Sequence, residues 1–233
     1  MLDPLNITPT IITGQVKKGD LPNLTQEQID FGFVPDINGL RAGDLILLQP
    51  LEPSKAQIEI INAQKPQYVA PAGTQTWTHA AVYLKDWRLI EAVPGDHVTH
   101  GNLLASVPNC RILVRRPALF AHKTPNEAEL LGMQLALEAA LHLGVARYGL
   151  LAAFLIKLRI KSPSIKLPQK YSEMKSDSII CSGLYAKCFQ IAASGNSLLT
   201  PAMQRNDVPV TPFLLSQVSS LTDVHVGWSK LVA

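Results

Sequence analysis

The chain has 233 residues and a net charge of +3; 47% of its residues are hydrophobic and 17% are charged. These values are typical of a globular protein with a sizeable core, and they exclude an intrinsically disordered chain. The small net charge does not indicate a nucleic-acid-binding surface. Three cysteines far apart in the sequence do not form a disulfide framework, so we expect free thiols in a reducing compartment or a thiol kept for chemistry.

No stretch of the sequence is typical of a secretory signal or a membrane span. Residues Met1 to Ile12 lack a basic region followed by a long apolar run. The longest apolar run, Tyr148 to Ile156, ends at Lys157 and is shorter than the roughly 18 to 20 residues needed to cross a bilayer. We therefore expect a cytoplasmic protein, with export by a route that needs no signal as the alternative.

The chain is interpreted as one domain with a lead-in. Residues 1–39 are rich in Pro, Gly, Asn and Asp and predict an extended segment that wraps the domain. This segment holds one short predicted helix at 24–31, capped by Asn23 or Thr25. Residues 40–233 are predicted to form the single domain.

The centre of the chain predicts an antiparallel sheet. A Gly43-Asp44 turn precedes a continuously apolar strand, the pattern of a strand buried on both faces. Two runs on either side of a Lys85-Asp86 turn are predicted to form a β-hairpin. The predicted strands are 45–48, 76–84, 87–93, 97–101 and 110–116.

Helices dominate the second half of the chain. The clearest is 127–143, with Asn126 as its cap and Gly144 as its stop. Its apolar side consists of Leu130, Leu131, Met133, Leu135, Leu137, Leu141 and Leu143. Further helices are predicted at 54–63, 150–160, 181–193 and 213–218, and an edge strand at 224–231. Adjacent strands followed by helices predict an α+β fold with an antiparallel sheet and helices packed on one side.

Cys181 is the candidate nucleophile because it stands at the start of a predicted helix. The unpaired N–H groups and the positive end of the helix dipole favour a thiolate over a thiol. The small neighbours Ser182 and Gly183 leave the sulfur approachable and allow a backbone N–H to face an oxyanion. The alternative is a structural cysteine that fills space, which is the interpretation that we give to Cys188.

His79 and Glu91 are the candidate partners of the cysteine. Each is an ionisable residue inside an apolar strand, and a spacing of 12 residues across a tight hairpin can place them on the same face. A hydrogen bond that only pins the hairpin is the structural alternative. The other histidines, His100, His122, His142 and His225, are predicted to lie on the surface, while His97 follows a turn that could be close to the site.

The order of these motifs carries a family resemblance. It runs from Gly43-Asp44 with its strand through Thr78-His79 and Ile90-Glu91-Ala92 to Cys181-Ser182 opening a helix. Over most of residues 40–193 this order resembles the circularly permuted NlpC-type papain-like proteins, including the bacterial YiiX and YaeF type and, more distantly, the lecithin:retinol acyltransferase group. In the permuted branch the histidine strand precedes the cysteine helix, as it does here.

The resemblance implies a permuted papain-like fold and an active site made of Cys181 as nucleophile, His79 as base and Glu91 as the residue that orients the imidazole. It also implies that Tyr148 and Ser182 line the substrate cleft, although packing is an equal alternative for Tyr148. The acyltransferase relatives have a second histidine at the position of Glu91, so their lipid chemistry is not carried over directly.

The implied chemistry is acyl transfer through a thioester, with no metal and no cofactor. The expected activity is that of a cysteine hydrolase on an amide bond of a peptide or peptidoglycan-type substrate. One alternative is an acyl hydrolase or acyltransferase acting on a lipid ester, with helix 150–160 in peripheral contact with a membrane rather than in the core. A second alternative is a non-catalytic binding module on the same fold. An acylated small molecule, a peptide or a lipid is the expected partner, and nucleic acid is not.

Overall fold

The computed structural model describes residues 8–64, 76–93, 97–143, 147–148, 178–179, 181–193 and 210–233. Its helices are α1 (Gln26–Phe31), α2 (Lys55–Gln64), α3 (Pro125–Ala140), α6 (Cys181–Ala192) and α7 (Pro212–Gln217). Its strands are β1 (Ile12–Lys17), β2 (Phe33–Pro35), β3 (Leu45–Pro50), β4 (His79–Lys85), β5 (Arg88–Ala92), β6 (Val98–Asn102), β7 (Cys110–Pro117), β8 (Arg147–Tyr148), β9 (Ser178–Ile179), β10 (Leu221–Val224) and β11 (Trp228–Val232). The predicted helix at 150–160 lies outside the described residues.

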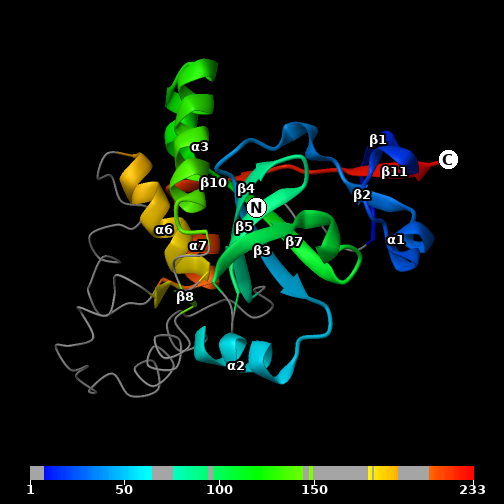
Figure 1. The fold of residues 1–233 in the computed structure, drawn as a ribbon, viewed down its shortest axis with the longest axis horizontal. Coiled ribbons are helices and arrows are strands. Elements are labelled where there is room, and N and C mark those ends of the chain that lie inside the picture. The colour runs from blue at the N-terminus through cyan, green and yellow to red at the C-terminus, as the bar shows by residue number, and fades with distance from the viewer. Residues whose placement is uncertain are drawn as a thin grey trace.

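A six-stranded sheet in the order β10-β7-β3-β4-β5-β6 forms the centre of the molecule, and every neighbouring pair of strands is antiparallel (Figure 1). The predicted hairpin is its β4–β5 pair, although the turn lies one residue later than expected. Asp86 and Trp87 form it with positive φ angles of 50° and 69°, the backbone twist that suits a two-residue hairpin. The predicted α+β fold with an antiparallel sheet and packed helices is confirmed.

The sheet separates two hydrophobic cores. On one face, side chains such as Leu45, Val82 and Ile90 pack against residues of α3, α6 and α7. On the other face, side chains such as Ile46 and Leu89 pack against the N-terminal segment and β11. Strand β3 contributes to both cores, which is why its sequence is continuously apolar rather than alternating.

A second sheet joins the two ends of the described chain in the order β1-β11-β2 (Figure 1). Strand β11 pairs parallel with β1 and antiparallel with β2, and Phe31 and Trp228 pack edge to face beside it with ring centroids 5.5 Å apart. The single edge strand predicted at 224–231 is wrong, because the chain there forms two strands, β10 and β11, that belong to different sheets. The division of the chain at residue 39 stays a prediction.

Helix α3 buries only part of the apolar side that its sequence predicts, with Leu135 in the core and Leu131 packed against it. Its buried residues are Ala128, Gly132, Leu135, Ala136 and Ala139, whereas Leu130, Met133, Leu137 and Leu141 are 55–65% exposed. The small residues allow a close approach to the turn before β3. A Cβ at Gly43 would lie 2.7 Å from the carbonyl oxygen of Gly132, so neither glycine has room for a side chain. Close packing of backbones, rather than large side chains, decides which face of α3 is buried.

The segment that carries α7 and β10 is held by one buried arginine. Arg115 of β7 donates from Nη1 to the carbonyl oxygens of Leu215 and Val218, at 2.9 and 3.1 Å, and from Nη2 to that of Leu221. Its Nε donates to Asp223 at 2.8 Å. A buried guanidinium is stable only when its donors are paired, so this arginine fixes the C-terminal segment against the sheet.

The packing of α3 predicts that two leucines two positions apart contribute very differently to the stability of the protein. Leu135→Ala removes a fully buried side chain and should lower the free energy of unfolding by roughly 2–5 kcal/mol. Leu137→Ala removes a side chain that is 59% exposed and should change it by about 0.5 kcal/mol or less. Urea unfolding of both variants measures the difference, and equal losses would contradict this orientation of the helix.

Candidate active site

The site begins where α6 meets the start of β4. Cys181 is the first residue of α6 and is 7% exposed, and its sulfur accepts hydrogen bonds from the backbone N–H groups of Ala80 and Ser182. The β4–β5 ladder ends at the pair of Ala81 and Glu91. The sulfur therefore lies beside the start of β4, at the same end of the hairpin as Glu91.

Two side-chain hydrogen bonds fix the orientation of α6. The hydroxyl of Tyr185 donates to the carbonyl oxygen of Gly43 at 2.9 Å, and the hydroxyl of Ser182 donates to that of Val210, also at 2.9 Å. Tyr185 and Ser182 are both fully buried. The helix start, and with it Cys181, is therefore held in place by the turn before β3 on one side and the approach to α7 on the other.

His79 and Glu91 lie together at the same end of the sheet. Because Ala81 is directly opposite Glu91, His79 is its diagonal neighbour on the same face, within reach of long side chains. The Nε2 atom of His79 lies 2.5 Å from Oε2 of Glu91, and the side chains are 21% and 18% exposed. The imidazole is also hydrogen-bonded to Cys181. With Nε2 engaged by the carboxylate, Nδ1 is the ring nitrogen available to the sulfur.

Electrostatics favour a thiolate at Cys181 and an imidazolium at His79. Burial alone would raise the pKa of Cys181, but the hydrogen bond and charge of His79, with the two backbone N–H groups, lower it overall. Burial would likewise lower the pKa of His79, but its hydrogen bonds to Cys181 and Glu91 raise that pKa to about 10. Both shifts favour the form of the pair in which the sulfur is a thiolate and the imidazole carries the proton.

The other two cysteines show the opposite behaviour. Burial raises the pKa of Cys110 to about 11 and that of Cys188 to about 12, and neither has a histidine partner among the causes of its shift. All three cysteines are free thiols. A lowered pKa thus separates Cys181 from cysteines that fill space, as the contrast with Cys188 in the sequence predicts.

The structure says less about the two residues predicted to line the substrate cleft, Tyr148 and Ser182. Tyr148 lies in β8, whose pairing with β9 brings its backbone beside Ile179, two residues before the cysteine. The hydroxyl of Ser182 is buried in its bond to Val210, so only its backbone N–H faces the sulfur. Roles for Tyr148 and Ser182 in substrate binding stay predictions.

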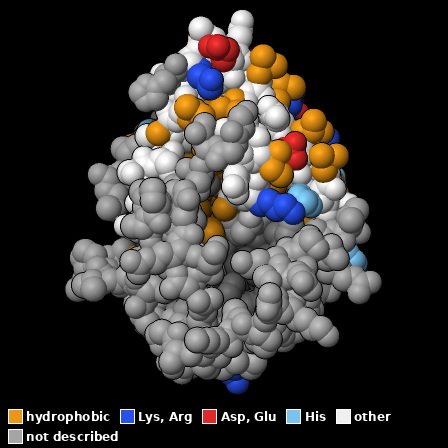
Figure 2. Space-filling model, turned by 90° about the vertical axis from the view of Figure 1, so that its left-hand side faces the viewer, with side chains coloured by type: hydrophobic (Ala, Val, Ile, Leu, Met, Phe, Trp, Pro, Cys, Tyr) orange, Lys and Arg blue, Asp and Glu red, His pale blue; other side chains and the backbone are white. Residues whose placement is uncertain are grey.

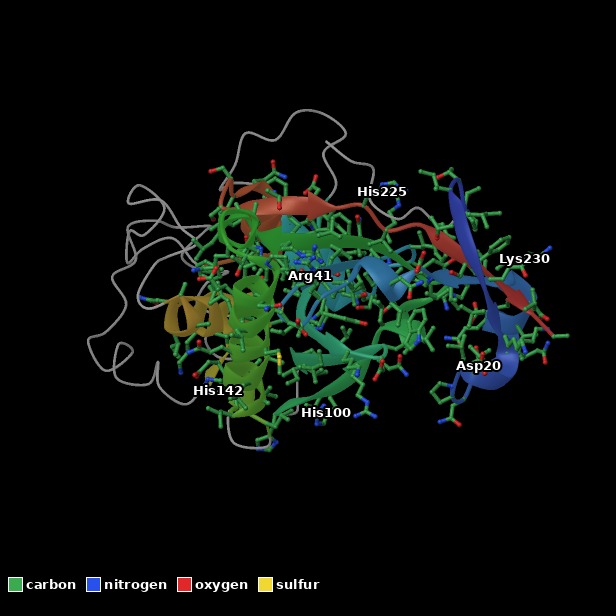
Figure 3. The ribbon with its side chains drawn as sticks, turned by 90° about the horizontal axis from the view of Figure 1, so that it is seen from above. Asp20, Arg41, His100, His142, His225 and Lys230 are labelled. Atoms are coloured by element: carbon green, nitrogen blue, oxygen red, sulfur yellow. The ribbon has the colours of Figure 1, made fainter. Side chains whose placement is uncertain are left out.

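The other histidines that the structure describes lie on separate elements. Figure 3 shows His225 on the opposite side of the molecule from His100 and His142. His100 and His225 are exposed, as predicted, whereas His142 is half-buried at the end of α3, where burial and the nearby Lys187 lower its pKa. Among the histidines whose side chains the structure describes, His79 alone has an interaction with a cysteine as a cause of its pKa shift.

Sequence reasoning did not find the backbone contribution of Ala80. Its hydrogen bond to the sulfur joins β4 to the start of α6, and the type of a residue does not show what its backbone N–H will bond to. The sequence also gave no reason to single out Gly101, which lies against the carboxylate of Glu91. Both features depend on contacts between elements rather than on residue types.

A groove with a volume of about 1010 Å³ lies at the opposite end of β4 from His79. Its lining includes Arg41, Tyr83, Lys85, Met133 and Leu137, so it runs between the hairpin turn and α3. In Figure 2, hydrophobic side chains gather in the upper part of the molecule, where α3 stands in Figure 1. This groove is separate from the Cys181 site.

The described residues show neither a metal-binding cluster nor a helix that could span a membrane. Within the ranges that the structure covers, no three His, Cys, Asp or Glu side chains gather into a group that could hold a metal ion. In the same part of the chain, none of the helices has the length and apolar character that crossing a membrane requires.

Comparison with solved structures found similar chains. The chain is similar to a crystal structure described as the metalloprotein YiiX from Escherichia coli O157:H7, with 19% identity and a TM-score of 0.48 over 79% of this chain and 96% of that one. YiiX is also a type that the sequence resemblance names, whereas membership of the permuted papain-like class stays a prediction. No family model and no curated protein matches the chain.

The charged pair predicts a specific pH dependence of alkylation. In the wild type, Cys181 should react with iodoacetamide with an apparent pKa below the ordinary thiol value of about 8.5. In His79→Ala, burial dominates and the pKa rises, so the rate at pH 7 should fall at least about tenfold, because each pKa unit changes the thiolate fraction about tenfold. Peptide mapping by mass spectrometry assigns the modified residue.

Cys110 and Cys188 serve as internal controls for this measurement, since their raised pKa values keep them protonated at pH 7. A Cys181 rate that is no faster than theirs, or that is unchanged by His79→Ala, would show that the sulfur and the imidazole do not form a charged pair.

Proposed function

We propose that the protein is a cysteine hydrolase that cleaves an amide bond through a thioester intermediate. The observation that carries this proposal is the hydrogen-bonded series of Cys181, His79 and Glu91, with a lowered pKa at the sulfur and a raised pKa at the imidazole. A nucleophile, a base that holds its proton and a group that orients the base are the parts that acyl transfer requires.

In the first half of the reaction, the Cys181 thiolate attacks the carbonyl carbon of the substrate and forms a carbon–sulfur bond. The tetrahedral intermediate then collapses and breaks the carbon–nitrogen bond, while His79 gives its proton to the leaving amine. In the second half, His79 takes a proton from water, the resulting hydroxide attacks the thioester, and the acid leaves as the thiolate is restored. Glu91 holds the imidazole and stabilises its charged form throughout.

The start of α6 supports stabilisation of the oxyanion. Backbone N–H groups at a helix start have no partner within the helix, and they face the carbonyl oxygen of a substrate that is bonded to the first residue. The N–H of Ser182 already donates to the sulfur, which leaves that of Cys181 itself as the donor best placed for the oxyanion. This arrangement needs no additional side chain.

An ester of a lipid is the second candidate substrate, and the surface of α3 is the observation that favours it. Leu130, Met133, Leu137 and Leu141 form an exposed apolar stripe along this helix. The helix runs towards the end of the sheet that holds the site, because Leu143 forms a bridge with Val98 of β6. An apolar stripe that approaches the site suits a substrate presented at a lipid surface.

The proposal is tested with three substrate classes, namely peptide amides, muropeptides and phosphatidylcholine vesicles. We expect turnover of an amide, with an acyl adduct on Cys181 in the intact mass spectrum. Cys181→Ala should lower kcat by roughly 10³-fold or more, and Glu91→Gln, which leaves nucleophile and base in place, by about 10²-fold. Turnover of vesicles alone would select the lipid alternative, and full activity in Cys181→Ala would refute the thioester.

A further inference from the structure

We propose that Gly101 is a positioning residue whose missing side chain leaves the space in which the Glu91 carboxylate lies against His79. The role of the site itself rests on the proposed function, but the contact between residues 91 and 101 does not.

Gly101 lies on β6, the edge strand next to β5. Thr99 is directly opposite Glu91, and Gly101 is directly opposite Leu89. A side chain at position 101 would therefore stand on the same face of the sheet as Glu91 and be its diagonal neighbour. That face also carries His79, so Glu91 has the imidazole on one side and the glycine on the other.

The Glu91 side chain fills the place of the missing side chain. A Cβ added at Gly101 would lie 2.7 Å from Cδ of Glu91 and 3.4 Å from Cγ, and still closer to Oε1. The other carboxylate oxygen, Oε2, is the atom 2.5 Å from Nε2 of His79. One oxygen thus lies over the glycine while the other holds the imidazole.

Backbone geometry does not explain why this residue is a glycine. Gly32 and Gly43 are the glycines with positive φ among the described residues, and Gly101 is not one of them. A residue with a side chain can adopt the backbone of β6 at this position without strain. The requirement at position 101 is for space rather than for conformational freedom.

Gly43, Gly132 and Gly101 are all crowded, but they differ in what a side chain would meet. At Gly43 and Gly132 the nearest atoms belong to the backbone, which cannot move without shifting α3 or the turn. At Gly101 the nearest atoms are the end of a flexible side chain. A methyl group at position 101 therefore displaces the carboxylate and leaves the sheet in place, so its effect is on the site.

The test is the titration of His79 followed by NMR in the full chain, in a Cys181→Ala background that removes the thiol. Gly101→Ala should lower the pKa of His79 by about one unit or more, because a carboxylate at hydrogen-bond distance raises a histidine pKa by an amount of this order. Gly101→Ala should add no further shift in Glu91→Gln, since the group that it displaces no longer carries the charge. Gly19→Ala is the matched control, because a Cβ there meets nothing within 4 Å.

The thermal midpoints of the same variants separate positioning from loss of the fold. Gly101→Ala should keep its midpoint within a few degrees of the parent, and any loss should disappear in Gly101→Ala/Glu91→Ala, where the methyl group has room. An unchanged His79 titration, an equal shift with and without Glu91, or a loss of stability that persists in the double variant would each overturn the proposal.

The titration needs no substrate and no reactive thiol, so it stands apart from the proposed activity. If none of the peptide, muropeptide and lipid substrates is turned over while Gly101→Ala lowers the pKa of His79, the positioning role is supported and the proposed hydrolase activity is refuted. If an amide is cleaved equally well by Gly101→Ala and its parent, and the titration is unchanged, the hydrolase holds and the positioning role does not.

Discussion

The interaction between the imidazole of His79 and the sulfur of Cys181 is the contact on which the charges of the site depend. It joins the helix that carries the candidate nucleophile to the strand that carries the candidate base, two elements that are about 100 residues apart in the chain. Hydrogen bonds from the backbone N–H groups of Ala80 and Ser182 act on the same sulfur. The sulfur is thereby held beside His79, and the charges of the two groups then stabilise one another.

Two further sets of contacts hold the residues around this contact in place. Buried hydrogen bonds from Tyr185 and Ser182 hold the helix start, while the hairpin places Glu91 behind the imidazole. Cys181 is 7% exposed, whereas the side chains of His79 and Glu91 are 21% and 18% exposed. The sulfur is therefore shielded by protein, whereas the imidazole remains within reach of water, as the proposed hydrolysis would require.

Features that depend on neighbouring residues in the chain were predictable from the sequence. The hairpin, the helix that begins at Cys181 and the proximity of His79 to Glu91 all follow from short loops and local periodicity. The packing of α3 was not, because apolar periodicity favours the leucines and the structure buries the face with Gly132 instead. Hydrophobicity indicates that a helix has an apolar side, whereas the fit of backbone to backbone decides which side is buried. The division between β10 and β11 and the bond from Ala80 could not be predicted either, because both depend on partners that are distant in the sequence.

The pairing of β1 with β11 also bears on how the chain is synthesised. Strands β1 and β2 leave the ribosome about 200 residues before their common neighbour β11, and Arg115 precedes the carbonyl groups that pair it by about 100 residues. During elongation the nascent chain therefore carries unpaired strand edges and an unpaired arginine, and neither is satisfied until the C-terminal segment emerges. The two sheets are therefore completed only after residues 221–232 have been synthesised, so the fold does not grow steadily from its N-terminal strands.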